Sequence, residues 1–134
     1  MTSRRQRGDG ALSRAARGGE SFRRGLWAET LCLWLLRLKG YRILARRYRS
    51  RAGEIDLIAQ RGSVVVAVEV KARSRRDQAG EALLWRQRAR IARALENYLA
   101  MHPRLRESSL RFDVMLVAPR NWPRHIQDAW RPES

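Results

Sequence analysis

Cysteine and histidine are scarce in this chain of 134 residues, which has one cysteine, Cys32, and two histidines, His102 and His125. A single cysteine cannot form an internal disulfide, and this indicates a reducing, cytoplasmic setting. Without a cluster of Cys and His residues, a zinc-type site is excluded. Because Cys32 stands between Leu31 and Leu33, we expect a buried and unreactive thiol.

Acidic residues and lysines are also few. Thirteen Asp and Glu stand against 29 Lys and Arg, which gives a formal net charge of +16, and only two of those 29 basic residues are lysines. This excess favours a polyanion as partner, nucleic acid first and an anionic membrane surface second, over the substrates of small-molecule metabolism. The hydrophobic fraction of 44% is normal for a folded protein.

No hydrophobic run is long enough to span a bilayer. The most apolar stretch, residues 26–38, has 13 residues and contains Glu29 and Arg37, whereas a membrane-spanning helix needs about 20. Two arginines precede it, as in a signal peptide, but no small-residue cleavage site follows. We therefore predict a core helix, apolar almost all round and well buried, and no membrane partner.

The first 24 residues differ from the rest, because they hold seven Arg, two acids and four Gly and carry a net charge of +5. This composition predicts a disordered tail. Such a tail either grips phosphates without sequence preference or is a solvated extension. Residues 25–134 suit one domain with its own core.

Hydrophobic patterning predicts two helices, at residues 26–39 (ended by Gly40) and 81–100. It predicts strands at residues 41–48, 54–60, 64–71 and 110–118, with a short final strand at 125–130. Short turns should make the first three strands an antiparallel meander, and the second helix should cross over to a parallel fourth strand. The predicted fold class is α/β, with an α-β-β-β-α-β core and a mixed sheet of four to five strands flanked by helices.

Acidic side chains gather on the second and third predicted strands. Because strand side chains alternate between faces, Glu54 and Asp56 share one face, and so do Glu69 and Lys71. A hairpin turning at about residues 61–63 then lays Asp56 beside Glu69. Two close carboxylates repel each other unless a cation lies between them. Oxygen ligands favour Mg²⁺ or Mn²⁺, which can orient a water and stabilise charge on a phosphate.

Two further residues fit this chemistry. Lys71 can lose its proton beside a metal and act on an attacking water, which arginine cannot do. Glu29 lies at the edge of the apolar surface of the first helix and needs a partner, so it can point at the metal directly or through water. The alternative is that these acids simply pair with arginines, an interpretation that suits Glu54 better than Asp56, Glu69 and Lys71 together.

Longer motifs surround these residues: GYRIL at 40–44, YR at 48–49, GEIDLI at 53–58, VEVKAR at 68–73 and RFDV at 111–114. With the order of elements, they resemble the PD-(D/E)xK nuclease superfamily of restriction endonucleases and Holliday junction resolvases. Within it they look like the YraN-like family of small bacterial proteins. The resemblance covers about residues 25–130. It implies a nuclease that uses Mg²⁺ or Mn²⁺, acts on DNA rather than RNA, and pairs as a homodimer.

The resemblance also implies a role for each matching residue. Asp56 and Glu69 would be metal ligands, with the backbone carbonyl of Val70 as a third. Lys71 would orient or deprotonate the attacking water. Glu29 corresponds to an acid that the first helix of the resolvase-like members directs at the metal.

The second helix carries a further match, because Gln87 corresponds to a polar residue that approaches the site. Two positions depart from the family pattern. The usual Asn before the Tyr-Arg pair is Arg47 here, and the usual Lys before the glutamine is Arg86. Both changes keep or add positive charge.

Arginines flank the predicted site, where they could hold phosphates on either side of a scissile bond. The candidates are Arg47, Arg49 and Arg51 beside the second strand, Arg73, Arg75 and Arg76 after Lys71, and Arg86 on the second helix, where Arg90 and Arg93 continue the stripe. The alternative is a solvated basic face. Trp122 and Trp130 fit packing residues better than base-stacking platforms.

We therefore expect a Mg²⁺-dependent endonuclease that hydrolyses phosphodiester bonds of DNA or structured nucleic acid, with a 3′-hydroxyl leaving. Two alternatives stay open. One is a module that binds nucleic acid on the nuclease fold with little or no turnover. The other is a basic protein associated with RNA or the ribosome.

Overall fold

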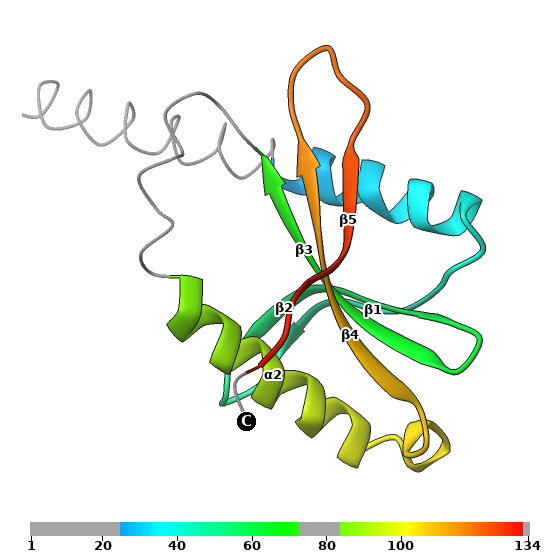
Figure 1. Cartoon of the computed structure of the whole chain (residues 1–134), viewed down its shortest axis with the longest axis vertical. Coiled ribbons are helices and arrows are strands. Elements are labelled where there is room, and N and C mark those ends of the chain that lie inside the picture. The colour runs from blue at the N-terminus through cyan, green and yellow to red at the C-terminus, as the bar shows by residue number, and fades with distance from the viewer. Residues whose placement is uncertain (1–24, 73–83, 133–134) are drawn as a thin grey trace, which may run out of the picture.

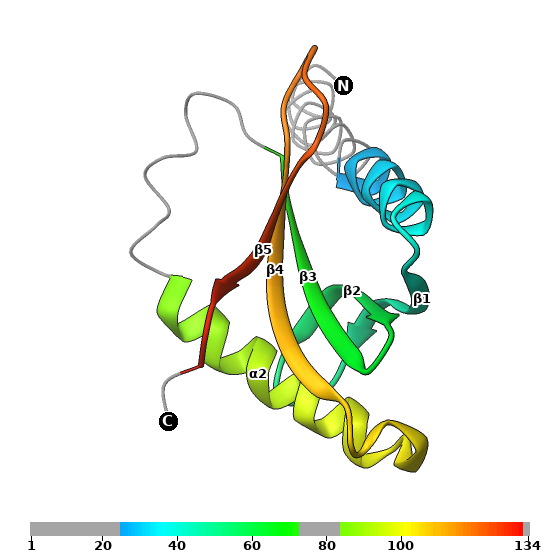
Figure 2. The same cartoon turned by 45° about the vertical axis from the view of Figure 1, so that its right-hand side comes forward.

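The computed structural model describes residues 25–72 and 84–132. Five strands form one sheet in the order β1-β2-β3-β4-β5, with helices on its two faces (Figures 1 and 2). The helices are α1 (residues 25–38) and α2 (Leu84–Ala100), followed by a short 3₁₀ helix, η2 (Pro103–Leu105). The strands are β1 (Arg42–Arg49), β2 (Glu54–Arg61), β3 (Val64–Ala72), β4 (Ser109–Val117) and β5 (Arg124–Trp130).

The sheet has the predicted topology. β1, β2 and β3 form an antiparallel meander, β4 lies parallel to β3, and β5 closes the edge antiparallel to β4. The α/β fold class and the short fifth strand are thus confirmed, and the strand ends move by one residue at most. The predicted tail and the first three residues of the second helix lie outside the described residues.

Two apolar clusters cover the two faces of the sheet. On one face Val66 and Val68 of β3 pack with residues of α1, and on the other Val65 and Ala67 pack with residues of α2. β3 is therefore buried on both sides, as expected for the strand at the centre of a sheet covered by helices. Its polar residues come only at the C-terminal end, where Glu69 and Lys71 follow the valines.

Gly40 ends α1 as predicted. The N–H of Gly40 bonds to the carbonyl of Arg37, and the N–H of Tyr41 bonds to the carbonyl of Leu36. This is the Schellman pattern, which needs a left-handed residue at its centre. Gly40 supplies it with φ +91°, and the chain then enters β1.

α1 corrects one prediction, because it is not buried all round. Its inner face carries Cys32 and Leu36, both 0% exposed. Its outer face leaves Trp27, Trp34 and Leu38 64%, 56% and 83% exposed. The helix lies on the surface of the sheet, so only one face finds a partner. Burial raises the pKa of Cys32 to about 12, with smaller contributions from nearby carboxylates, which agrees with an unreactive thiol.

No helix in the described part of the chain combines the length and the apolar character needed to cross a membrane.

Candidate active site

β2 and β3 part at the end of their ladder, and the candidate site lies where they part. Their backbone pairing runs from Arg61 and Val64 to Leu57 and Val68. Beyond that pair, the Val70 N–H donates a hydrogen bond of 2.8 Å to Oδ2 of Asp56. A carboxylate thus takes the place of a backbone acceptor between the two strands.

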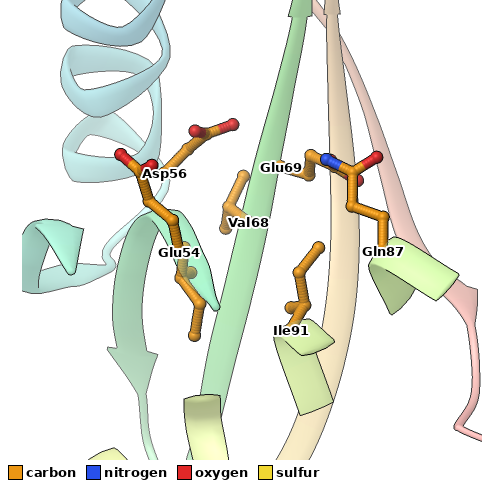
Figure 3. Close-up of a pocket in the computed structure, with 7 residues that line it drawn as sticks. Glu54, Asp56, Val68, Glu69, Gln87 and Ile91 are labelled. Carbon is orange, nitrogen blue, oxygen red and sulfur yellow. The ribbon is translucent and has the colours of Figure 1, made fainter. Parts of the chain in front are cut away.

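A cleft of about 150 Å³ opens at this point. Figure 3 shows Glu54 and Asp56 from β2 on one side, and Glu69 from β3 and Gln87 from α2 on the other, with the Gln87 amide directed toward Glu69. This volume holds a few water molecules, each of about 30 Å³. It is smaller than the 300–1,000 Å³ of typical small-molecule sites, so it suits a hydrated ion or a phosphate oxygen.

A negative charge on Asp56 is unfavourable in this cleft. Burial is the largest cause that raises the pKa of Asp56 to about 6, and the charges of Glu69, Glu29 and Glu54 raise it further, against the Val70 N–H that lowers it. Glu69 is 8% exposed, and its Oε1 lies 3.4 Å from Nζ of Lys71. The hairpin therefore brings Asp56 and Glu69 to the same cleft, as the sequence predicts, while Lys71 contacts Glu69 and is not among the residues that line the cleft.

Among the described residues, arginine pairing accounts for Glu54 but not for Asp56 and Glu69. Glu54 does pair with an arginine, since its Oε1 lies 3.5 Å from Nε of Arg49 on an exposed surface. Asp56 and Glu69 have no arginine partner among the residues that the structure describes. The alternative interpretation thus holds for Glu54, and the arginines of residues 25–72 and 84–132 give it no support for the central pair.

Glu29 lies next to the cleft but does not line it. Its carboxylate is buried on α1, with Nε of Arg47 3.0 Å from Oε2 and Nε of Arg46 3.5 Å from Oε1. Oε1 is nevertheless buried without a hydrogen bond among the described groups. Glu29 therefore acts on Asp56 through its charge.

Arg47 has an uncommon backbone conformation beside the site. Its φ is +52°, and its neighbours Arg46 and Tyr48 pair with Leu57 and Ile55, on either side of Asp56. Asn tolerates this left-handed region better than other residues with a side chain. This gives a physical reason why the resembling family carries Asn here, while Arg47 supplies the ion pair to Glu29 instead.

The other candidate arginines fall into two groups. Arg49, Arg51, Arg86, Arg90 and Arg93 are exposed, on β1, the following turn and α2. The segment with Arg73, Arg75 and Arg76 lies outside the described residues.

The two tryptophans singled out in the sequence behave differently. Trp130 is a packing residue as predicted, since it is 6% exposed and stacks on Phe112 with ring centres 4.3 Å apart. For Trp122 the packing prediction is wrong, because the turn that carries it leaves 82% of the residue exposed.

The oxygen ligands of the cleft suit a Mg²⁺ ion that keeps part of its water shell. Within residues 25–72 and 84–132 no three His, Cys, Asp or Glu side chains gather closely enough to hold a metal by themselves. Mg²⁺ does not require that, because it keeps several waters and binds through one or two carboxylates. Asp56 and Glu69 are such a pair, and the Val70 backbone lies beside them. The repulsion between the carboxylates of Asp56 and Glu69 favours binding of a cation.

A second polar cluster escaped the sequence reasoning. Asp113 is 0% exposed, and its carboxylate accepts hydrogen bonds from Arg111, from Nε2 of His125 at 2.7 Å, and from the N–H of Asp128. Burial alone would raise the pKa of Asp113, but the bonds from His125, Arg111 and the Asp128 backbone hold it at about 2. His125, which the sequence presents as isolated, thus ties β5 to β4. The alternation of Arg111 and Asp113 on one strand face was the available signal.

The known proteins that this chain resembles in sequence belong to one family, whose activity is uncharacterised. The model of the uncharacterised protein family UPF0102 matches residues 28–117. A UPF0102 protein of Parvibaculum lavamentivorans is 54% identical over 89% of this chain and 94% of its own length. One of Methylorubrum extorquens is 50% identical over 93% and 94%, and one of Paramagnetospirillum magneticum is 53% identical over 81% and 88%.

Proposed function

This chain belongs to the uncharacterised protein family UPF0102, and we propose that it is a Mg²⁺-dependent nuclease that hydrolyses phosphodiester bonds in nucleic acid. One observation carries the proposal. Asp56 and Glu69 converge where β2 and β3 part, in a cleft sized for a hydrated ion, and no arginine of the described residues neutralises them. The net charge of +16 supports a polyanionic substrate, and the motifs resemble the PD-(D/E)xK superfamily.

The residues of the cleft divide the work as follows. Mg²⁺ held by Asp56 and Glu69 would supply a Lewis acid that activates water and neutralises charge on the phosphate. Lys71, whose Nζ lies 3.4 Å from Oε1 of Glu69, would orient the attacking water or take its proton. Gln87 orients that water from α2. The water oxygen would bond to phosphorus in line while the bond to the 3′ oxygen breaks, and the departing 3′ oxygen would take a proton from solvent water.

The neighbouring groups hold the cleft in place. Glu29 is fixed by Arg46 and Arg47, and its charge raises the pKa of Asp56. The Val70 N–H fixes one oxygen of Asp56, which leaves the other for a ligand. The exposed arginines on β1 and α2 bind the flanking phosphates.

Cleavage assays test the proposal directly. We expect hydrolysis of single-stranded, duplex or branched DNA, or of RNA, with Mg²⁺ or Mn²⁺, and loss of that activity in Asp56→Ala and Lys71→Ala. The matched control is Lys39→Ala, which removes the only other lysine and should keep full activity. Cleavage that survives Asp56→Ala and Lys71→Ala would contradict the assignment, because it would come from another site or a contaminant.

A second candidate is a nucleic-acid-binding module that does not turn over. The ion pairs of Glu29 and of Glu69 with cations of the chain favour it, because part of the negative charge is already balanced. Titration calorimetry with Mn²⁺ distinguishes the two. The nuclease should bind the ion and lose it in Asp56→Asn, whereas a module without an active site should show no metal binding in either protein.

A further inference from the structure

The turn between β4 and β5 presents an aromatic ring to solvent. Trp122 is 82% exposed, and the hairpin that carries it extends past the end of β3 in both views (Figures 1 and 2). Single exposed apolar residues are common on proteins. The rigidity, charge and location of this turn therefore indicate which kind of ligand Trp122 would contact.

The backbone of the turn is restricted. Pro119 and Pro123 stand on either side, and proline fixes its own φ and limits the residue before it, which is Trp122 here. Arg120 is held at φ +65°, a region that costs a residue with a side chain about 1–3 kcal/mol and is found where the surroundings impose it. A preset turn of this kind loses little freedom when its side chains bind a ligand.

The charge around Trp122 has one sign. Arg120 and Arg124 stand two residues before and two residues after Trp122 and are exposed, and neither has an ion pair or hydrogen bond through its side chain in the described part of the chain. No acidic residue occurs between Asp113 and Asp128. An aromatic ring between unpaired arginines suits a strand of nucleic acid, whose bases stack on the ring while its phosphates bind the arginines.

The turn lies at the same end of the sheet as the candidate site. Lys71 aligns with Leu116 on β4, and Leu116 aligns with Arg124 on β5. Two strand spacings put the Arg124 backbone roughly 10 Å from that of Lys71, and Trp122 is two residues, or about 7 Å, further along. A strand with one phosphate at the cleft would bring another base to Trp122 within a few nucleotides.

We propose that Trp122, with Arg120 and Arg124, binds unpaired nucleobases of a single-stranded segment beside the cleavage site. The proposal rests on the proposed function for the place of the scissile phosphate, while the binding itself needs no hydrolysis. Bases within a duplex already stack on their neighbours, so an exposed ring selects unpaired ones. The substrate class is then DNA or RNA with a single-stranded segment, such as an overhang or a branch.

Binding without metal tests this inference. In EDTA, the full chain is titrated against four labelled 12-nucleotide ligands: single-stranded DNA, single-stranded RNA, an abasic DNA backbone and duplex DNA. The variants are Trp122→Ala and Trp122→Phe, with Trp34→Ala on α1 as the control for removing an exposed tryptophan. Circular dichroism checks that each variant is folded.

We expect Trp122→Ala to weaken binding of an unpaired strand about tenfold or more, the range found for stacked bases, in DNA, in RNA or in both. Binding of the abasic backbone and of the duplex should stay within about twofold, Trp122→Phe should retain most of the affinity, and Trp34→Ala should match the wild type. An equal loss on the abasic backbone would overturn the proposal, because the ring would then act through the phosphates or the fold. Unchanged binding of both unpaired strands would overturn it too.

Failure of this inference can be told from failure of the nuclease proposal. Trp122-dependent binding without any metal-dependent cleavage would uphold the stacking role and remove the hydrolytic one. Cleavage that requires Lys71, in a protein whose binding ignores Trp122, would uphold the nuclease and remove the stacking role.

Discussion

Replacing Asp56 by Asn should stabilise the metal-free protein. The carboxylate is half-buried, and its folded pKa of about 6 lies above the ordinary value of 3.8 because of burial and the charges of Glu69, Glu29 and Glu54. Asn removes the charge and keeps an oxygen that can accept the Val70 N–H. The folded protein therefore no longer carries an unfavourable charge at neutral pH.

The magnitude follows from the shift in pKa. Because the folded pKa is raised, the folded state holds the proton more tightly than the unfolded state between about pH 4 and pH 6. Stability falls as pH rises through this window and levels off above it. A shift of about two units corresponds to about 3 kcal/mol at pH 7.5 and about 1 kcal/mol at pH 4.5. Asp56→Asn should recover these amounts.

Urea unfolding with EDTA at the two pH values measures the effect, with the exposed Glu107→Gln as the control for loss of one negative charge. Adding Mg²⁺ should then stabilise the wild type, by an amount that grows with the ion concentration over its Kd, and leave Asp56→Asn unchanged. A variant that is no more stable at pH 7.5, or one whose gain is the same at both pH values, would refute the electrostatic account of Asp56.

Four further outcomes test the rest of the structure. Asp113→Ala should lower the free energy of unfolding by about 3–5 kcal/mol, because it leaves the charge of Arg111 without its buried partner. In the wild type, the depressed pKa of Asp113, about 2, should make stability fall between about pH 4 and pH 2, which acid titration of the unfolding transition can follow. Gly53→Ala should destabilise the protein by about 1–3 kcal/mol, since a Cβ there would lie 2.9 Å from Cβ of Arg90. Gly25→Ala is the control, because a Cβ at Gly25 has nothing within 4 Å, and thermal unfolding compares the two variants. Cys32, 0% exposed, should react with a thiol reagent at pH 8 only after denaturant is added, and rapid labelling of the folded protein would contradict its burial.

Most of the fold could be predicted from local patterns in the sequence. The β-branched run of β3 and the alternation in β2 identify strands without tertiary information. The short turn between them fixes which side chains face each other, so Asp56 and Glu69 could be paired from the sequence. Gly40 likewise identified the end of α1.

Features that depend on distant neighbours were out of reach. An apolar helix such as α1 does not reveal which of its faces the sheet covers, so the exposure of Trp34 could not be foreseen. His125 finds Asp113 only once β5 lies beside β4. Trp122 and Trp130 have similar sequence settings, and only the hairpin shows that one is buried and the other is at its tip.

The surroundings of Asp56 and Glu69 explain why no arginine in residues 25–72 and 84–132 pairs with them. Asp56 is held between two strands by a backbone N–H, and Glu69 is enclosed with Val68, Ile91 and Gln87 around the cleft. Within the described residues, the cation that contacts Glu69 is Lys71, two residues along the same strand. A fold that needed these acids for stability alone would lose nothing by an arginine here, yet a charged Asp56 carries a cost, because burial and the neighbouring carboxylates raise its pKa to about 6. That cost has a physical reason if a cation from outside the chain completes the site, which supports the proposed Mg²⁺-dependent chemistry.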